Sequence, residues 1–235
     1  MRKIILASTS SLHGEAYLAY LKPKLKVFFD GISTLLFIPY ARPGGLNHDE
    51  YTSKVAAAFA ELGIRVTGLH TFADPAEAIK NAQSIFTGGG NTFLLVKQLH
   101  ELGLMPILKE AVQQGTPYLG TSAGSNIGGL NMQNTNDMPI VYPPSFQTMG
   151  LVPFNINAHY LDPDPTSKHN GETRETRIKE FHIFNSTPVV GLREGSWIEC
   201  NGDGVTLEGA LAARIFLQGK EPYEIDPSTN LYHLF

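Results

Sequence analysis

The sequence predicts an α/β fold, in which helices cover both faces of a parallel sheet. Three observations support this fold class. Short apolar segments of strand length alternate with segments of helical periodicity through the first 120 residues. Short loops join these segments, as they do in βαβ units. The segment 34–40 (TLLFIPY) is apolar throughout, which is typical of a strand buried on both faces of a parallel sheet.

Five strands and the helices between them can be placed along the first half of the chain. The strands are expected at residues 3–8, 34–40, 65–69, 84–87 and 117–122, where apolar or β-branched residues fill a strand's length. The helices are expected at residues 14–29, 49–62, 74–82, 92–102 and 105–114, where helical spacing or a helix-start signal is found. Pro23 breaks the first helix or starts a second one. Gly63 ends the next helix, and Asp74 followed by Pro75 is a typical helix start.

The pattern changes after residue 129. Four prolines interrupt a longer irregular stretch, and they are Pro139, Pro143, Pro144 and Pro153. From Val189 onward, short strands with turns at 201–204 and 217–220 predict a C-terminal region of β-hairpins. Neither a linker-like composition nor an internal repeat is present, so we expect a single domain over residues 1–235.

Composition excludes several classes of protein. The net charge of −4, without a Lys/Arg cluster, argues against nucleic-acid binding. No apolar run has transmembrane length, and the one after Lys3 is too short for a secretory signal. The single cysteine, Cys200, excludes an intrachain disulfide and suits a reducing compartment, so we expect a cytoplasmic protein. We expect no metal or other cofactor, because the sequence contains neither H-E-x-x-H nor clustered ligand spacing.

The segment 118–124 (YLGTSAG) predicts a nucleophile elbow. A short apolar strand runs into G-x-S-x-G, which would lift the hydroxyl of Ser122 clear of the sheet edge. A helix beginning at Ala123 would direct backbone N–H groups toward this hydroxyl. The run Gly88–Gly90 also follows a predicted strand, at the edge of a parallel sheet where ligands bind. The alternative is a glycine-rich loop with an incidental serine, because isolated matches to this motif are common.

A serine nucleophile requires a base and a group that orients the base. Among eight histidines, His159 stands out because it closes an alternating segment, 154–159, that reads as a strand ending in a loop. Two carboxylates are candidates for the orienting group. Asp137 lies in a polar loop after the elbow, and Glu194 lies in a turn after an apolar strand. Each also has a simple alternative, as a turn residue or a solvated carboxylate.

Six sequence blocks resemble the peptidase E family of cytosolic α-aspartyl dipeptidases. In order they are GGGNT, GTSAGSN, NTNDMPIV, NINAHY, GETRETRI and GLREGSWI, and the similarity covers nearly the whole chain. The resemblance implies a flavodoxin-like sheet similar to that of class I glutamine amidotransferases, with serine at the elbow. It also implies hydrolysis of dipeptides with an N-terminal aspartate (Asp-X), by a monomer or a homodimer.

The resemblance assigns roles to individual residues. Ser122 would be the nucleophile and His159 the general base, with Asp137 or Glu194 as the third member of a triad. Of the two, Asp137 is favoured, because a carboxylate on a loop downstream of the elbow can return over the end of the sheet. The oxyanion would be held by the N–H group of Ala123.

A second oxyanion amide would come from the glycine run, at Gly89 or Gly90. Arg174 matches the substrate-binding arginine and can form a bidentate pair with a carboxylate. The loop 160–173 is slightly longer than the family pattern predicts, which leaves open the shape of the pocket on the leaving-group side.

Three other functions fit part of the same pattern. An α/β-hydrolase esterase shares G-x-S-x-G, but its histidine normally lies near the C-terminus, whereas more than seventy residues follow His159. A cyanophycinase-like hydrolase would use the same serine on β-aspartyl-arginine peptides. A non-enzymatic protein could bind aspartyl peptides without turnover, although the complete set of Ser122, His159 and Arg174 argues against this.

Overall fold

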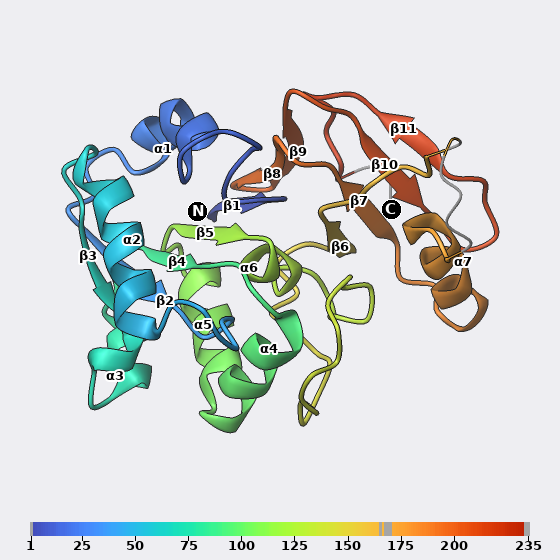
Figure 1. The fold of residues 1–235 in the computed structure, drawn as a ribbon. Coiled ribbons are helices and arrows are strands. Elements are labelled where there is room, and N and C mark those ends of the chain that lie inside the picture. Colours follow the sequence, from blue (N-terminus) through green and yellow to red (C-terminus); the bar gives the residue numbers. More distant parts are fainter. Residues whose placement is uncertain (1, 165, 167–170, 233–235) are drawn as a thin grey trace.

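The computed structural model describes residues 2–164, 166 and 171–232 and contains a large and a small β-sheet with flanking helices (Figure 1). The large sheet has seven strands in the order β3 (Arg65–Gly68), β2 (Thr34–Ile38), β4 (Ile85–Thr87), β5 (Tyr118–Thr121), β1 (Lys3–Ala7), β8 (Ser196–Asn201) and β9 (Gly204–Gly209). The first five are mutually parallel, while β8 runs antiparallel to β1 and to β9. The predicted α/β fold with a parallel sheet is therefore confirmed, and an antiparallel hairpin extends it.

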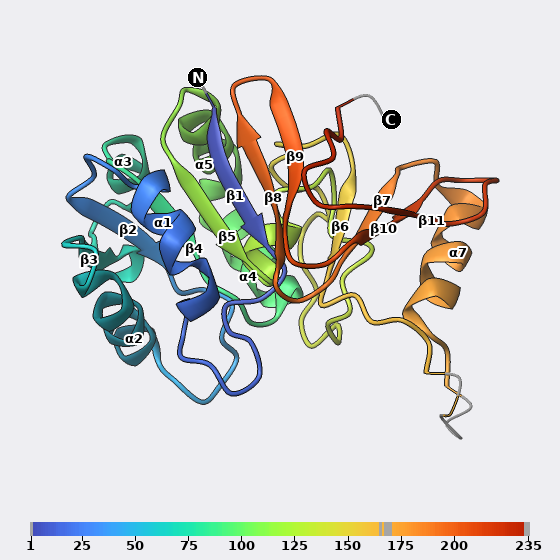
Figure 2. The same ribbon diagram turned by 90° about the horizontal axis from the view of Figure 1, so that it is seen from above.

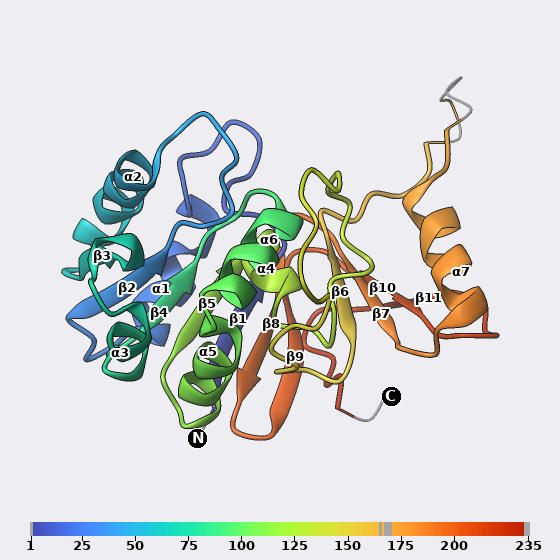
Figure 3. The ribbon, with the colours of Figure 1, turned by 90° about the horizontal axis from the view of Figure 1, so that it is seen from below.

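Helices cover both faces of the large sheet, as predicted. One face carries α1 (Lys22–Phe28) and α2 (His48–Ala60). The other carries α3 (Pro75–Lys80), α4 (Thr92–Glu101) and α5 (Leu104–Gln113). The two groups lie in front of the sheet in the opposite views of Figure 2 and Figure 3. Successive residues of β1 alternate between these faces, since Ile5 packs with the first group and Ile4 with the second.

The small sheet lies beside the antiparallel end of the large one (Figure 1). Its order is β11 (Tyr223–Ile225), β10 (Ala213–Phe216), β7 (Val189–Leu192) and β6 (Asn155–Ala158). The helix α7 (Arg174–Phe184) packs on this sheet through Ile178. Ile156 and Val190 of the small sheet share one hydrophobic core with Ile4 of the large sheet. A shared core of this kind is expected of a single domain. The single-domain organisation over residues 1–235 stays a prediction.

Two predicted features differ in detail. The expected helix over residues 14–29 contains only a 3-10 turn, η1 (Ala19–Leu21), followed by α1, and Pro23 lies in the first turn of α1, where a missing N–H costs nothing. The predicted hairpin turns are present between β8 and β9 and between β10 and β11, but the two hairpins belong to different sheets. Another 3-10 turn, η2 (Leu69–Thr71), follows β3. Of the helices in the described ranges, none has the length and apolar character needed to cross a membrane.

Candidate active site

Ser122 lies in a tight turn between β5 and the single-turn helix α6 (Ala123–Asn126), so the strand–turn–helix context of the motif is present. Its backbone has φ 53° and ψ −113°, a conformation that non-glycine residues rarely adopt. The two glycines of the motif allow close backbone packing around it. A Cβ atom on Gly120 would collide with the carbonyl of Gly124, and one on Gly124 would collide with the carbonyl of Thr87. The turn thus presses against β4 and presents the serine at the carboxyl edge of the sheet.

The imidazole of His159 lies between a hydroxyl and a carboxylate. Its Nε2 is 2.9 Å from Ser122 Oγ, and its Nδ1 is 2.6 Å from Glu194 Oε1. With Nδ1 protonated and donating to the carboxylate, Nε2 is free to accept the proton of the serine hydroxyl. The arrangement can therefore activate Ser122 as a nucleophile.

Strand pairing explains why Glu194 reaches the histidine. The strands β6 and β7 are parallel, with Ala158 paired with Leu192. His159 directly follows the first strand, and Glu194 lies two residues beyond the second, so both side chains extend from the same edge of the small sheet. His159 also has a positive φ of 55°, and its backbone N–H donates to Ser8 Oγ at 2.8 Å.

Ser8 is a site residue that the sequence did not single out. It directly follows β1 and is fully buried. Its hydroxyl accepts from the His159 amide and donates to the carbonyl of Leu192 at 2.7 Å, so one side chain ties the ends of β1, β6 and β7 together. A serine at a strand end carries no local signal of such a role.

Asp137 occupies a different place from the one expected. Its Oδ2 accepts the backbone N–H of Thr92 at 2.7 Å and the hydroxyl of Thr135 at 2.9 Å. Thr92 is the first residue of α4, so this carboxylate lies at a helix N-terminus, where negative charge is favoured. The structure brings Glu194, not Asp137, to the imidazole. The sequence-based preference for Asp137 does not agree with this geometry. Its loop does reach the end of β6, where Asn136 donates to the carbonyl of Ala158 at 2.8 Å, but the carboxylate of Asp137 is directed to the start of α4.

The glycine run lies beside the serine. It follows β4, the neighbour of β5, and a Cβ atom on Gly89 would lie 3.0 Å from Ser122 Cβ. Within the described ranges, the N–H groups of Gly89, Gly90 and Ala123 donate no hydrogen bond to the protein. These amides are therefore available to the carbonyl oxygen that becomes negatively charged when Ser122 attacks the adjacent carbonyl carbon. The hydroxyl of Tyr51 donates to the carbonyl of Gly89 at 3.2 Å and holds this loop from the opposite side.

A cavity of about 330 Å³ lies beside the histidine. It is lined by His159, Tyr160, Leu161, Asp162, Arg174, Arg193, Glu194 and Leu211. The two arginines differ in their hydrogen bonding. All five N–H donors of Arg193 are used within the protein, whereas Nη1 of Arg174 is buried without a hydrogen-bond partner among the described residues. Arg174 is therefore the arginine of this cavity that retains a donor for an anionic ligand.

The electrostatic surroundings of Arg174 are mixed. Burial lowers the pKa of its guanidinium and Arg177 lowers it further, while the carboxylates of Glu194 and Asp137 act in the opposite direction. An arginine remains cationic under such shifts. In the part of the chain that the structure describes, no group of three or more His, Cys, Asp and Glu side chains could hold a metal ion.

The chain is similar in sequence and in fold to known proteins. The profile of "Peptidase family S51" matches residues 4–208. A Streptomyces coelicolor protein named peptidase E is 46% identical over 98% of this chain and 94% of its own length. A Drosophila melanogaster protein named "probable alpha-aspartyl dipeptidase" is 44% identical over 99% of this chain and 97% of its own. The crystal structure of a peptidase from an acI-B1 actinobacterium, at 17% identity, has a TM-score of 0.73 and covers 98% of this chain and 96% of that one, which shows a common fold.

Proposed function

The chain belongs to peptidase family S51, and we propose that it is a serine dipeptidase that hydrolyses dipeptides with an N-terminal L-aspartate. The observation that carries the proposal is the hydrogen-bonded series Ser122–His159–Glu194 beside the open donor of Arg174. The names of two relatives, peptidase E and α-aspartyl dipeptidase, support the same substrate class.

The proposed reaction is acyl transfer through Ser122. His159 Nε2 takes the proton of the hydroxyl as Oγ attacks the carbonyl carbon of the aspartyl residue. The N–H groups of Ala123 and of Gly89 or Gly90 stabilise the oxyanion. The imidazolium then protonates the leaving amine, and the C–N bond breaks. Water, deprotonated by the same imidazole, attacks the ester and releases aspartate.

Glu194 and Arg174 have separate proposed roles. Glu194 orients the imidazole and stabilises its cationic form through the 2.6 Å contact with Nδ1. Arg174 binds the side-chain carboxylate of the substrate, because a guanidinium can pair with two carboxylate oxygens at once. Asp137 would act on the site indirectly, by fixing the start of α4 and thus the loop that carries Gly90.

The test is hydrolysis of Asp-Leu in EDTA, with Glu-Leu, Asn-Leu and β-Asp-Leu as competing substrates. We expect selective release of leucine from Asp-Leu, abolished by Ser122→Ala and retained by Ser53→Ala, which removes an exposed hydroxyl from α2. Residual turnover by Ser122→Ala would defeat the assignment of the nucleophile. Faster hydrolysis of β-aspartyl-arginine peptides than of Asp-Leu would instead favour the function of a cyanophycinase-like hydrolase.

Cys200 allows a further check that the nucleophile is a serine. It is buried in the large sheet, and burial raises the pKa of its thiol to about 12. Thiol reagents at pH 8 should therefore leave activity unchanged, while a serine-directed phosphonate should abolish it. The single cysteine also supports the proposal of a cytoplasmic location.

A further inference from the structure

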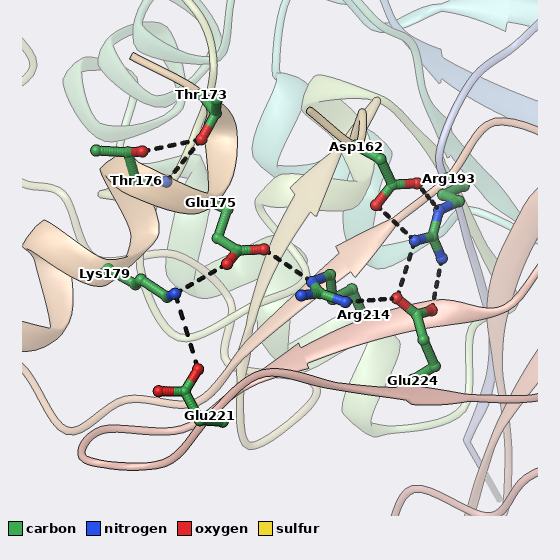
Figure 4. A network of polar contacts seen from close by, with 9 residues as sticks. All are labelled: Asp162, Thr173, Glu175, Thr176, Lys179, Arg193, Arg214, Glu221 and Glu224. Atoms are coloured by element: carbon green, nitrogen blue, oxygen red, sulfur yellow. Dashed lines mark hydrogen bonds and ion pairs between the residues drawn. The ribbon is translucent and has the colours of Figure 1, made fainter. Parts of the chain in front are cut away.

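An ion-pair network connects the segments that carry His159, Glu194 and Arg174. Five of its members, joined one to the next by the dashed lines of Figure 4, are Asp162, Arg193, Glu224, Arg214 and Glu175. Glu175 is also paired with Lys179, and Lys179 with Glu221. None of the five has a role in the reaction described above. Three of them are close in sequence to residues that do: Arg193 precedes Glu194, Asp162 is three residues after His159, and Glu175 follows Arg174.

Arg193 forms the first arm of this network. Its Nε and Nη2 donate to the two carboxylate oxygens of Asp162 at 2.9 and 2.8 Å. Its Nη1 and Nη2 donate to Glu224 at 2.8 and 3.0 Å, and Nη1 also donates to the carbonyl of Ala212 at 2.7 Å. The guanidinium, with 16% of the side chain exposed, lies over the ring of Tyr160. This bidentate geometry joins the loop after His159 to the turn that carries Glu194. It also ties both to Ala212, the residue before β10, and to Glu224 of β11.

Glu224 connects the first arm to a second one. Besides Arg193, it accepts from Arg214 Nη1 at 3.1 Å, and Arg214 Nε donates to Glu175 at 2.9 Å. Glu175 lies in the first turn of α7, next to Arg174, and only 18% of its side chain is exposed. The second arm therefore ties the start of α7, and with it Arg174, to the small sheet.

We propose that this network positions the active site, with Asp162–Arg193 setting the His159–Glu194 contact and Arg214–Glu175 setting the place of Arg174. The proposal rests on the proposed function for the roles of those three residues. Arg193 does not touch substrate, because its five donors are already used. The two arms act on different steps, so they must have different kinetic effects: the first arm affects kcat and the second affects KM for aspartyl substrates.

Asp162→Asn tests the first arm. Half of this side chain is exposed, so the substitution weakens one link while Arg193 keeps Glu224 and the protein stays folded. We expect kcat for Asp-Leu to fall about tenfold to a hundredfold with KM nearly unchanged, since a displacement of about 1 Å at the reacting groups costs about that much. Asp164→Asn is the matched control: it removes the same charge from the same loop, but its carboxylate accepts only from Thr166 among the described residues.

Proton NMR gives a readout of the first arm that does not depend on turnover. A short Nδ1–H···O contact such as that between His159 and Glu194 produces a far-downfield proton resonance. The resonance should be present in the wild type and in Asp164→Asn, and it should be broadened or lost in Asp162→Asn at an unchanged melting temperature. A purely stabilising role for the network would lower the melting temperature and leave this resonance in place.

Glu175→Gln tests the second arm. We expect KM for Asp-Leu to rise about tenfold and kcat to change less than about threefold, because Arg174 would lose its fixed position relative to the substrate carboxylate. Glu180→Gln, an exposed carboxylate of the same helix, is the matched control and should behave as wild type. Calorimetric titration with free L-aspartate should show the same tenfold weakening for Glu175→Gln.

The outcomes separate this proposal from the proposed function. Equal effects of Asp162→Asn and Glu175→Gln on both kcat and KM, or wild-type behaviour of both, would overturn the positioning role. If the wild type failed to hydrolyse Asp-Leu, the proposed substrate would be wrong, while the NMR comparison of Asp162→Asn with Asp164→Asn would still decide whether the network holds the His159–Glu194 contact.

Discussion

Replacing Glu194 by glutamine is the most direct test of how the imidazole is oriented. The substitution keeps the size of the side chain but removes the charge that faces His159 Nδ1 at 2.6 Å. In a buried serine triad, the corresponding change lowers kcat about 10⁴-fold. Here 49% of the Glu194 side chain and 36% of the His159 side chain are exposed, so water can partly replace the lost partner. We therefore expect a loss of about 10²–10³ in kcat, or about 2.7–4 kcal/mol in the activation free energy.

Asp137→Asn provides the comparison. This carboxylate accepts from Thr92 N–H at the start of α4, so its neutralisation removes a favourable charge at a helix N-terminus, worth about 0.3–1 kcal/mol of stability. We expect a small decrease in melting temperature and a loss in kcat below about tenfold. Steady-state kinetics on Asp-Leu and thermal melts of both variants measure these effects. A larger loss of kcat in Asp137→Asn than in Glu194→Gln would refute the assignment of Glu194 as the orienting group.

Three further changes probe the substrate cation, the oxyanion loop and the acid stability of the network. Arg174→Ala should raise KM for Asp-Leu far more than KM for a neutral dipeptide, and equal effects on the two substrates would contradict its role. Tyr51→Phe removes the hydrogen bond that holds the Gly89 peptide, so kcat should fall about tenfold with KM maintained; an unchanged kcat would show that this peptide is held by other contacts. Hydrogen bonds from Arg193 outweigh the opposing effect of burial and hold the pKa of the Glu224 carboxyl below its usual value. The ionised carboxylate therefore stabilises the fold at every pH above the unfolded-state pKa. This stabilisation is lost as the pH falls through the folded-state pKa. The melting-temperature difference between wild type and Glu224→Gln should accordingly be largest at pH 7 and shrink on acidification, and a difference that grew on acidification would contradict the sign of this linkage.

The sequence predicted the central strands of the large sheet because they are buried on both faces. The run 34–40 became β2 (Thr34–Ile38) and the run 117–122 became β5 (Tyr118–Thr121), each within two residues of the predicted bounds. Continuous apolar runs of this kind are local signals. The pairing of β8 with β1, where Ile5 lies opposite Glu199, joins segments far apart in the chain, and no local pattern identifies such a partner. The predicted C-terminal hairpins are therefore confirmed, but the sequence did not predict that they belong to two different sheets.

The same distinction holds for the site. Ser122 could be predicted as a nucleophile because the elbow motif is a local requirement of backbone packing. The choice between Asp137 and Glu194 depended on which strand lies beside β6, and neither distance along the chain nor loop composition contains that information. The parallel pairing of β6 with β7 brings residues 35 positions apart into contact. Only the fold of the small sheet shows that Glu194 is the carboxylate in contact with the imidazole.

The two sheets contribute different halves of the proposed catalytic apparatus. The large sheet supplies Ser122 from the end of β5 and Gly89 from the end of β4, while the small sheet supplies His159 and Glu194. Ser122 and His159 therefore meet only if the two sheets keep a fixed position relative to each other. Ser8 provides a direct polar link at this point, because its hydroxyl bonds both to the His159 amide and to β7 while its own backbone continues from β1. The shared apolar core brings the sheets together over a broad surface. The hydroxyl of Ser8 adds a directional contact, because it accepts one hydrogen bond and donates another. This contact lies next to the 2.9 Å approach of His159 Nε2 to Ser122 Oγ, the geometry that the proposed proton transfer requires.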